Sequence, residues 1–173
     1  MSTLRTAVLA LVAGIMPLAM TTGAFAATTI TVSLWDTGDH AMDMLDQAKP
    51  MGMGLMHKMM MSGDMKMGAM GITASATEIP AGDVTFTVTN DSKSMIHEMV
   101  LSAVTDPEAE LPYLVDEMKV DEDAAGHLGE VAELDPGKSG ELTLTLEPGD
   151  YLLFCNIPGH YALGMWTLIT VTP

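Results

Sequence analysis

The sequence contains a single cysteine, Cys155, and this excludes a fold held together by intramolecular disulfides. Basic residues are also scarce, because 7 lysines and arginines stand against 23 aspartates and glutamates, for a formal net charge of −16. A chain this acidic repels phosphate backbones, so we expect no nucleic acid among its partners. A lone thiol is open to oxidation in an oxidising compartment unless something such as a bound metal holds it.

The sequence also lacks an apolar run long enough to cross a membrane. After the single basic residue Arg5, the apolar run of residues 7–20 is interrupted by Pro17, and it is shorter than the roughly 20 residues of a spanning helix. It leads to Ala24-Phe25-Ala26, the small-x-small pattern that signal peptidase accepts. We therefore predict a cleavable signal peptide over residues 1–26 and a periplasmic or otherwise exported protein without stable membrane insertion.

The mature chain, residues 27–173, is predicted to form one domain of the all-β class. Short stretches that alternate apolar and polar residues are separated by Pro/Gly turns, at residues 29–35, 72–79, 83–90, 95–104, 131–134, 141–146, 151–155 and 165–172. Seven or eight such strands predict a Greek-key antiparallel β-sandwich. In the long connection between the fourth and fifth of them, Leu114 and Met118 lie one helical turn apart, which predicts a short helix over residues 111–120.

A methionine-rich segment, residues 36–71, interrupts the strand pattern near the N-terminus. It contains eleven methionines mixed with glycines, and the glycines argue against a long regular helix. We predict an inserted loop with a short helical turn around residues 55–61. Two interpretations remain open: the thioethers bind Cu(I) directly, or the segment is an apolar lid or docking surface over one end of the sandwich.

The stretch Tyr151–Met165 carries three metal donors at C-x4-H-x4-M spacing, namely Cys155, His160 and Met165. A thiolate, an imidazole and a thioether in one tight loop suit copper better than other common metals. His97, on a predicted neighbouring strand, is the best candidate for a fourth donor. Two imidazoles and a thiolate in a trigonal plane with a more distant thioether form a blue-copper site.

Other chemistries fit these donors less well. Zinc is bound by cysteine, histidine or carboxylate ligands and does not recruit a methionine. A cysteine hydrolase requires a third group that orients His160 as a base, and the sequence shows none near Cys155. The paired His-x-His ligands of multicopper oxidases and nitrite reductases are also missing from the sequence. We therefore do not expect an enzyme.

Residues 72–172 resemble a cupredoxin of the plastocyanin, azurin and auracyanin superfamily. The similarity lies in VTFTVTN leading to His97, in LEPGDYLLFC ending at Cys155, and in CNIPGHYALGM. The resemblance implies one type 1 copper ion and four ligands, in chain order His97, Cys155, His160 and Met165. It also implies that the ring edge of His160 reaches the surface as the exit for the electron. Glu98 departs from the family pattern, because plastocyanins and azurins usually have at this position an asparagine that ties the ligand loops together.

Two functions are consistent with this interpretation. The first is a monomeric periplasmic electron carrier between redox partners such as a cytochrome or an oxidase/reductase. The second is a copper storage or delivery protein that loads Cu(I) through the methionine-rich segment. A closed four-ligand site favours the first. The acidic residues between 106 and 123 either steer a basic partner or only solvate the protein. The apolar residues around His160 form the predicted contact patch, namely Ile157, Pro158, Ala162, Leu163 and Trp166.

Overall fold

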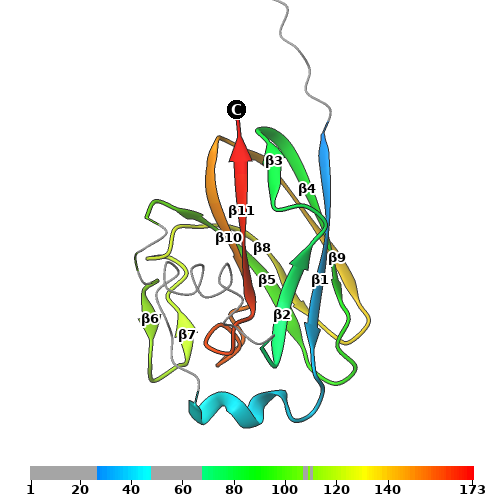
Figure 1. The fold of residues 1–173 in the computed structure, drawn as a ribbon, viewed down its shortest axis with the longest axis vertical. Helices are drawn as coiled ribbons and strands as arrows, with labels where there is room; N and C mark the ends of the chain where they lie inside the picture. The colour runs from blue at the N-terminus through cyan, green and yellow to red at the C-terminus, as the bar shows by residue number, and fades with distance from the viewer. Residues whose placement is uncertain (1–26, 48–67, 107–108, 110) are drawn as a thin grey trace, which may run out of the picture.

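Two β-sheets pack face to face, and a short hairpin lies beside one of them (Figure 1). The computed structural model describes residues 27–47, 68–106, 109 and 111–173. The predicted signal peptide and the helical turn predicted at residues 55–61 lie outside these ranges. No helix within the described ranges is long and apolar enough to cross a membrane.

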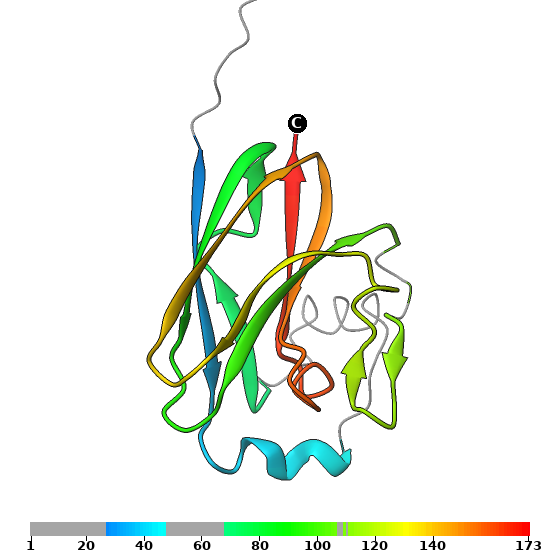
Figure 2. The same ribbon diagram turned by 180° about the vertical axis from the view of Figure 1, so that it is seen from behind.

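The first sheet has four strands, in the order β2 (Met70–Ala74), β1 (Thr28–Asp36), β4 (Gly82–Asn90) and β9 (Ser139–Leu146). The second has five, in the order β3 (Glu78–Pro80), β11 (Trp166–Thr172), β10 (Gly149–Phe154), β5 (His97–Val104) and β8 (His127–Leu134). Figure 2 shows the crossing of the two layers from the opposite side. The predicted β-sandwich is confirmed.

Two strand pairs depart from the predicted antiparallel arrangement, because β1 pairs with β4 in parallel and β3 pairs with β11 in parallel. The reason is the path of the chain between β1 and β4. The strand predicted over residues 72–79 is two strands, β2 and β3, which lie in different sheets. The chain thus leaves the first sheet after β2 and re-enters it at β4 from the same end as β1.

The helix predicted over residues 111–120 was also wrong. The segment forms a two-stranded hairpin of β6 (Tyr113–Leu114) and β7 (Lys119–Val120). Leu114 and Met118, whose spacing suggested a helix, are both 39% exposed. They therefore do not form the buried apolar face that an amphipathic helix would have. Met118 has a φ of 54°, a left-handed conformation that ends the turn rather than continuing a helix.

The main core lies between the sheets, where alternate residues of β4 point inward: Val84, Phe86 and Val88 are fully buried. A second apolar cluster covers the outer face of the five-stranded sheet, where Val120 of the hairpin lies with Val100 of β5 and Phe154 of β10. Most of β5 and β10 is therefore buried on both faces. Burial on both faces makes the two strands a firm support for the residues at their ends.

Asn90, at the end of β4, is fully buried and joins three segments. Its side-chain amide donates to the carbonyl oxygens of Met95 (2.9 Å) and Leu134 (2.7 Å), and its carbonyl oxygen accepts from the backbone N–H of Ser92 (2.9 Å). These bonds fix the turn that leads into β5. They therefore fix the position of His97, two residues beyond Met95.

We predict that Asn90→Ala lowers the free energy of unfolding by about 2 to 4 kcal/mol, because it leaves two carbonyl oxygens without their buried donor. Urea denaturation of residues 27–173 measures the change. The control is Thr89→Ala, which removes an exposed hydrogen bond to Ser139 and should cost less than about 1 kcal/mol. Equal losses in the two variants would contradict this role of Asn90.

Candidate metal centre

Three donor atoms meet at one end of the sandwich. His97 begins β5, Cys155 follows β10 directly, and His160 lies in the loop between β10 and β11. The Nδ1 atoms of His97 and His160 are 3.2 Å apart, and Cys155 Sγ lies 3.4 Å from His160 Nδ1 and 4.0 Å from His97 Nδ1. All three side chains are buried. The structure therefore brings these three predicted ligands together, because β5 and β10 are neighbours in the sheet.

The loop between β10 and β11 is closed by its own backbone hydrogen bonds. Cys155 N–H donates to the Met165 carbonyl oxygen (3.0 Å), and Met165 N–H donates to that of His160 (3.1 Å). Gly159 has a φ of +86°, a left-handed conformation that favours glycine and lets the loop turn. Met165 is fully buried in the main core directly before β11. The backbone thus holds the fourth predicted ligand, Met165, opposite Cys155.

Asp36, the last residue of β1, is a site residue that the sequence did not reveal. Its Oδ2 lies 2.8 Å from His97 Nε2, and the two side chains are 1% and 0% exposed. An ionised carboxylate only accepts hydrogen bonds, so Nε2 carries the proton and the Nδ1 lone pair is directed toward Cys155 and His160. Burial raises the pKa of Asp36, but hydrogen bonds from Ser92, His97 and Gly38 outweigh it and leave the pKa below its usual value.

Both histidines are neutral near pH 7. Burial lowers the pKa of His97, and Asp36 offsets only part of that effect. Burial, followed by the nearby His97, lowers the pKa of His160 to about 4. Burial raises the pKa of the Cys155 thiol to about 12, although backbone N–H groups of Glu98 and Ile157 favour the thiolate. Metal binding at this site must therefore release the proton of the Cys155 thiol.

The spacing of these donors fits one metal ion. Nitrogen and sulfur ligands bound at about 2.0 to 2.3 Å from a common ion lie roughly 3 to 4 Å from one another. The three separations in the structure, 3.2, 3.4 and 4.0 Å, fall in this range without any rearrangement. Two imidazoles and one thiolate, with a thioether available from Met165, are the donor set of a blue-copper site.

The expectation that the ring edge of His160 reaches the surface was wrong, because His160 is only 3% exposed. The segment after β1 explains part of this. It forms a 3-10 helix, η1 (Ala41–Gln47), at the same end of the molecule as the loop (Figure 1). A Cβ added to Gly159 would lie 2.8 Å from a methyl group of Leu45. The first part of the methionine-rich segment thus packs against the loop, as the lid interpretation proposes.

The predicted contact patch is smaller than expected. Leu163 and Trp166 are buried, Ile157 and Ala162 are half-buried, and Pro158 is exposed. Trp166 packs into the outer apolar cluster. The apolar surface next to His160 therefore consists of Ile157, Pro158 and Ala162.

Two neighbours of the donors are themselves buried and polar. Asn156 accepts from Val120 N–H (2.7 Å) and donates to the Val120 carbonyl oxygen (2.9 Å) and to Glu122 (2.7 Å). Glu98 is 6% exposed, and burial together with Glu133 raises its pKa to about 7. Asn156 and Asn90 therefore tie the segments around the site together.

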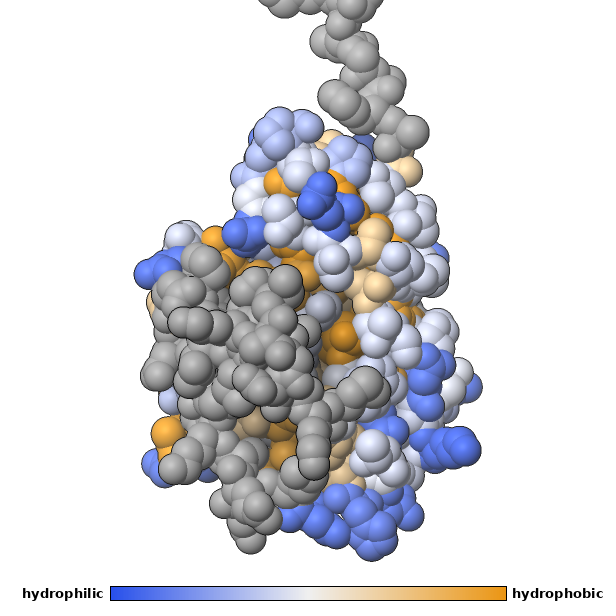
Figure 3. Space-filling view, in the orientation of Figure 1, coloured by the Kyte–Doolittle hydropathy of each residue, from blue (hydrophilic) through white to orange (hydrophobic). Residues whose placement is uncertain are grey.

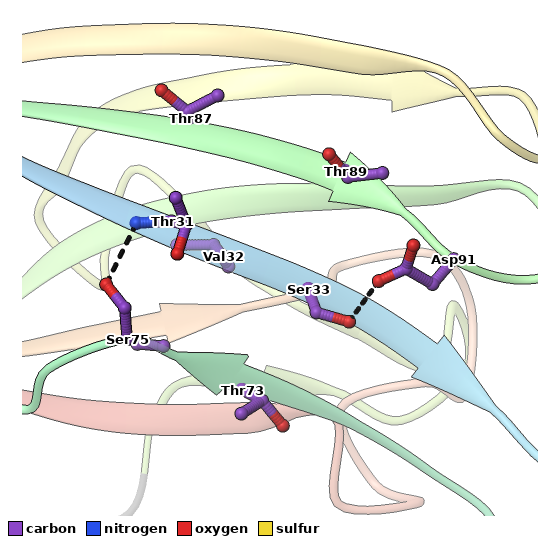
Figure 4. Close-up of a pocket in the computed structure, with 9 residues that line it drawn as sticks. Thr31, Val32, Ser33, Thr73, Ser75, Thr87, Thr89 and Asp91 are labelled. Carbon is purple, nitrogen blue, oxygen red and sulfur yellow. Dashed lines mark hydrogen bonds between the residues drawn. The ribbon is translucent and has the colours of Figure 1, made fainter.

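A pocket of 340 Å³ lies elsewhere, on the outer face of the four-stranded sheet (Figure 4). Most of its lining residues are serines and threonines. Two of its polar contacts run between neighbouring segments: Thr31 N–H donates to Ser75 Oγ, and Ser33 Oγ donates to Asp91. This lining contains no histidine or cysteine. It offers none of the soft donors that gather at Cys155.

Comparison with known proteins agrees with this geometry. A family model described as copper-binding proteins of the plastocyanin/azurin family matches residues 58–172. Auracyanin-B of Chloroflexus aurantiacus is 46% identical over 52 residues, which are 30% of this chain and 22% of that protein. The copper-resistant cuproprotein CopI of Pseudomonas aeruginosa is 54% identical over 41 residues, which are 23% of each chain. The chain thus matches less than a quarter of the length of either relative.

Solved structures show the same fold at low sequence identity. The reduced auracyanin of Roseiflexus castenholzii superposes with a TM-score of 0.51 at 22% identity, over 86% of this chain and all of that one. Rusticyanin from Thiobacillus ferrooxidans gives a TM-score of 0.51 at 18% identity, over 86% of this chain and 80% of that one. These likenesses support the sandwich architecture.

We predict that Asp36→Asn weakens copper binding by about 10- to 100-fold, because the neutral amide no longer supplies a charged partner that fixes the His97 ring and its tautomer. Competition with a Cu(I) chelator measures the affinity. Asp39→Asn is the matched control, since it removes the same charge from an exposed neighbour. An affinity of Asp36→Asn within twofold of the control would contradict the role given to Asp36.

Proposed function

Because the chain belongs to the plastocyanin/azurin family of copper-binding proteins, we propose that it is a one-electron carrier whose copper ligands are His97, Cys155, His160 and Met165. Copper bound to this donor set supplies a Cu(II)/Cu(I) couple. The protein supplies the fixed positions of the donors. No enzymatic step is part of the proposal.

The observation that carries the proposal is that His97, Cys155 and His160 meet with their donor atoms within 4.8 Å of one another. His97 is held by Asp36 and by its position at the start of β5, while the loop hydrogen bonds hold Cys155 and Met165. Donors that are fixed by packing and by further hydrogen bonds change position little when the charge on the metal changes. A small rearrangement is what fast electron transfer requires.

Accessible apolar residues beside His160 in the sequence support a contact route. His160 is covered, but the exposed Pro158 lies only two residues before it, beside the half-buried Ile157 and Ala162. We propose that a redox partner docks on these three residues. Figure 3 shows hydrophilic residues gathered at the same end of the molecule, near η1, where they would surround an apolar contact with charge.

The proposed location is the periplasm or another exported compartment. The motif at residues 24–26 supports a cleavable signal peptide. A buried thiol that is bound to metal would also survive in an oxidising compartment, where a free one would be oxidised.

Copper storage or delivery is the second candidate, favoured by the similarity to a protein described as copper-resistant and by the eleven methionines of residues 36–71. Burial argues against it as the main role. His97, Cys155, His160 and Met165 are each at most 3% exposed, so an acceptor protein has no direct access to the donors.

The two candidate functions differ in whether the reduced protein passes on an electron or releases its Cu(I) ion. We predict that copper-loaded residues 27–173 exchange electrons with a cytochrome c in stopped-flow measurements much faster than they give up Cu(I) to an excess of chelator. The closed donor set is the physical reason. Faster loss of copper than of electrons would favour the delivery function instead.

A matched pair of variants tests the docking patch. Pro158→Asp should slow electron exchange several-fold, because it places a charge in the apolar contact. Pro148→Asp introduces the same change at an exposed proline in the turn before β10, at the opposite end of the sandwich, and should leave the rate unchanged. Equal rates for the two variants would show that docking occurs elsewhere.

A further inference from the structure

A second group of metal-binding side chains lies away from the three donors described above. It consists of Glu122, His127 and Glu130, whose ligand atoms all lie within 4.8 Å of one another. Glu122 is half-buried in the turn between β7 and β8, while His127 and Glu130 are exposed on β8, the edge strand of the five-stranded sheet. The sequence alone indicates for this region only a solvated or steering acidic surface.

The turn that carries the group is fixed by its own hydrogen bonds. His127 N–H donates to the Glu122 carbonyl oxygen (3.0 Å), and Ala125 N–H donates to that of Asp121 (2.9 Å). Asn156 Nδ2 also donates to Glu122 Oε1 (2.7 Å). Glu122 and His127 are therefore neighbours because the turn folds in this way.

Glu98 is a second, independent observation on this face. It is 6% exposed, and its Oε1 has no hydrogen-bond partner among the described residues. Val100 lies opposite Glu130 in the register of β5 and β8, and alternation along β5 places Glu98 on the same outer face as Val100. Oε1 of Glu98 is thus a buried carboxyl oxygen without a hydrogen-bond partner, on the face that carries the group.

The charges around Glu98 are mostly of one sign. Its carboxyl group lies near three further acidic residues, Glu133, Glu122 and Glu130, and near one basic residue, Lys119. Within the described part of the chain, the only ion pairs closer than 4.0 Å are two His–Asp contacts at other positions. Lys119 therefore lies near these carboxylates without a close ion pair to any of them. A bound cation would relieve their repulsion.

We propose that this face binds one divalent transition-metal ion, such as Zn²⁺, through Glu122, His127 and Glu130, with Glu98 as a neighbouring buried carboxylate. Carboxylate oxygens with one imidazole suit Zn²⁺ and related divalent ions, whereas a thiolate and a thioether suit Cu(I). The two sites on this chain therefore differ in the metal that they prefer.

The second site is connected to the first by residues that are adjacent in the sequence. Glu98 follows His97, and Asn156, which holds Glu122, follows Cys155. A divalent cation bound here places positive charge beside the copper ligands of the proposed function. It should therefore raise the reduction potential of the copper, because positive charge disfavours Cu(II) more than Cu(I). This consequence rests on the proposed function, while the binding of Zn²⁺ does not.

Calorimetric titration of residues 27–173 with ZnCl₂, in a Cys155→Ser background that removes the thiolate of the first site, tests the binding. We expect one saturable Zn²⁺ per chain. His127→Gln should weaken the binding at least about tenfold. Removal of a residue that only hydrogen-bonds to a metal ligand can already cost that much, and His127 is itself a proposed ligand. Because this arm needs no copper, failure of the proposed function would not affect its result.

Two controls make the result specific. His40→Gln alters an exposed histidine that contacts Asp43, and Glu147→Gln alters an exposed carboxylate before β10. Neither should change the affinity for Zn²⁺. Absence of saturable binding, or equal weakening by His127→Gln and the controls, would show only diffuse attraction to an acidic surface and would overturn the proposal. Loss of binding in His40→Gln alone would overturn it as well.

Discussion

The pairing of β5 with β10 is the constraint on which the site depends. Phe154 lies opposite Val100 in their antiparallel register, so the continuation of β10 brings Cys155 next to the first residues of β5. Cys155 Sγ consequently accepts a hydrogen bond from Glu98 N–H (3.5 Å) and lies beside His97. Apolar clusters cover both faces of the two strands, which keeps this register from slipping.

Much of the fold and of the site could be predicted from the sequence, for local reasons. The alternation in residues 83–90 and 141–146 predicted strands because one face of each strand packs against the main core. The donors Cys155, His160 and Met165 lie within one loop, so their spacing alone placed them together. Asp36 had no such signal, because its contact with His97 joins residues 61 positions apart. The hairpin of β6 and β7 was missed because it packs through Val120, whereas Leu114 and Met118 are exposed.

Buried polar groups connect the two faces of the five-stranded sheet. On the inner side, Asp36 orients His97, and on the outer side Asn156 holds Val120 and Glu122. Hydrogen bonds thus tie the donor His97 to the end of β1, and they tie Asn156, the residue after the donor Cys155, to the segment that contains Val120 and Glu122. On the outer side, Glu98 and Asn156 therefore lie one residue along the chain from the inner donors His97 and Cys155.

The proposed function requires that Cys155 binds copper as a thiolate together with His97, His160 and Met165. The visible absorption spectrum of residues 27–173 after addition of one equivalent of Cu(II), measured beside that of Cys155→Ser, tests this requirement without any partner protein. We expect an intense blue thiolate-to-copper band in the wild-type protein and none in the variant. A wild-type protein without the band, or a variant that keeps it, would show that Cys155 is not a copper ligand of this kind.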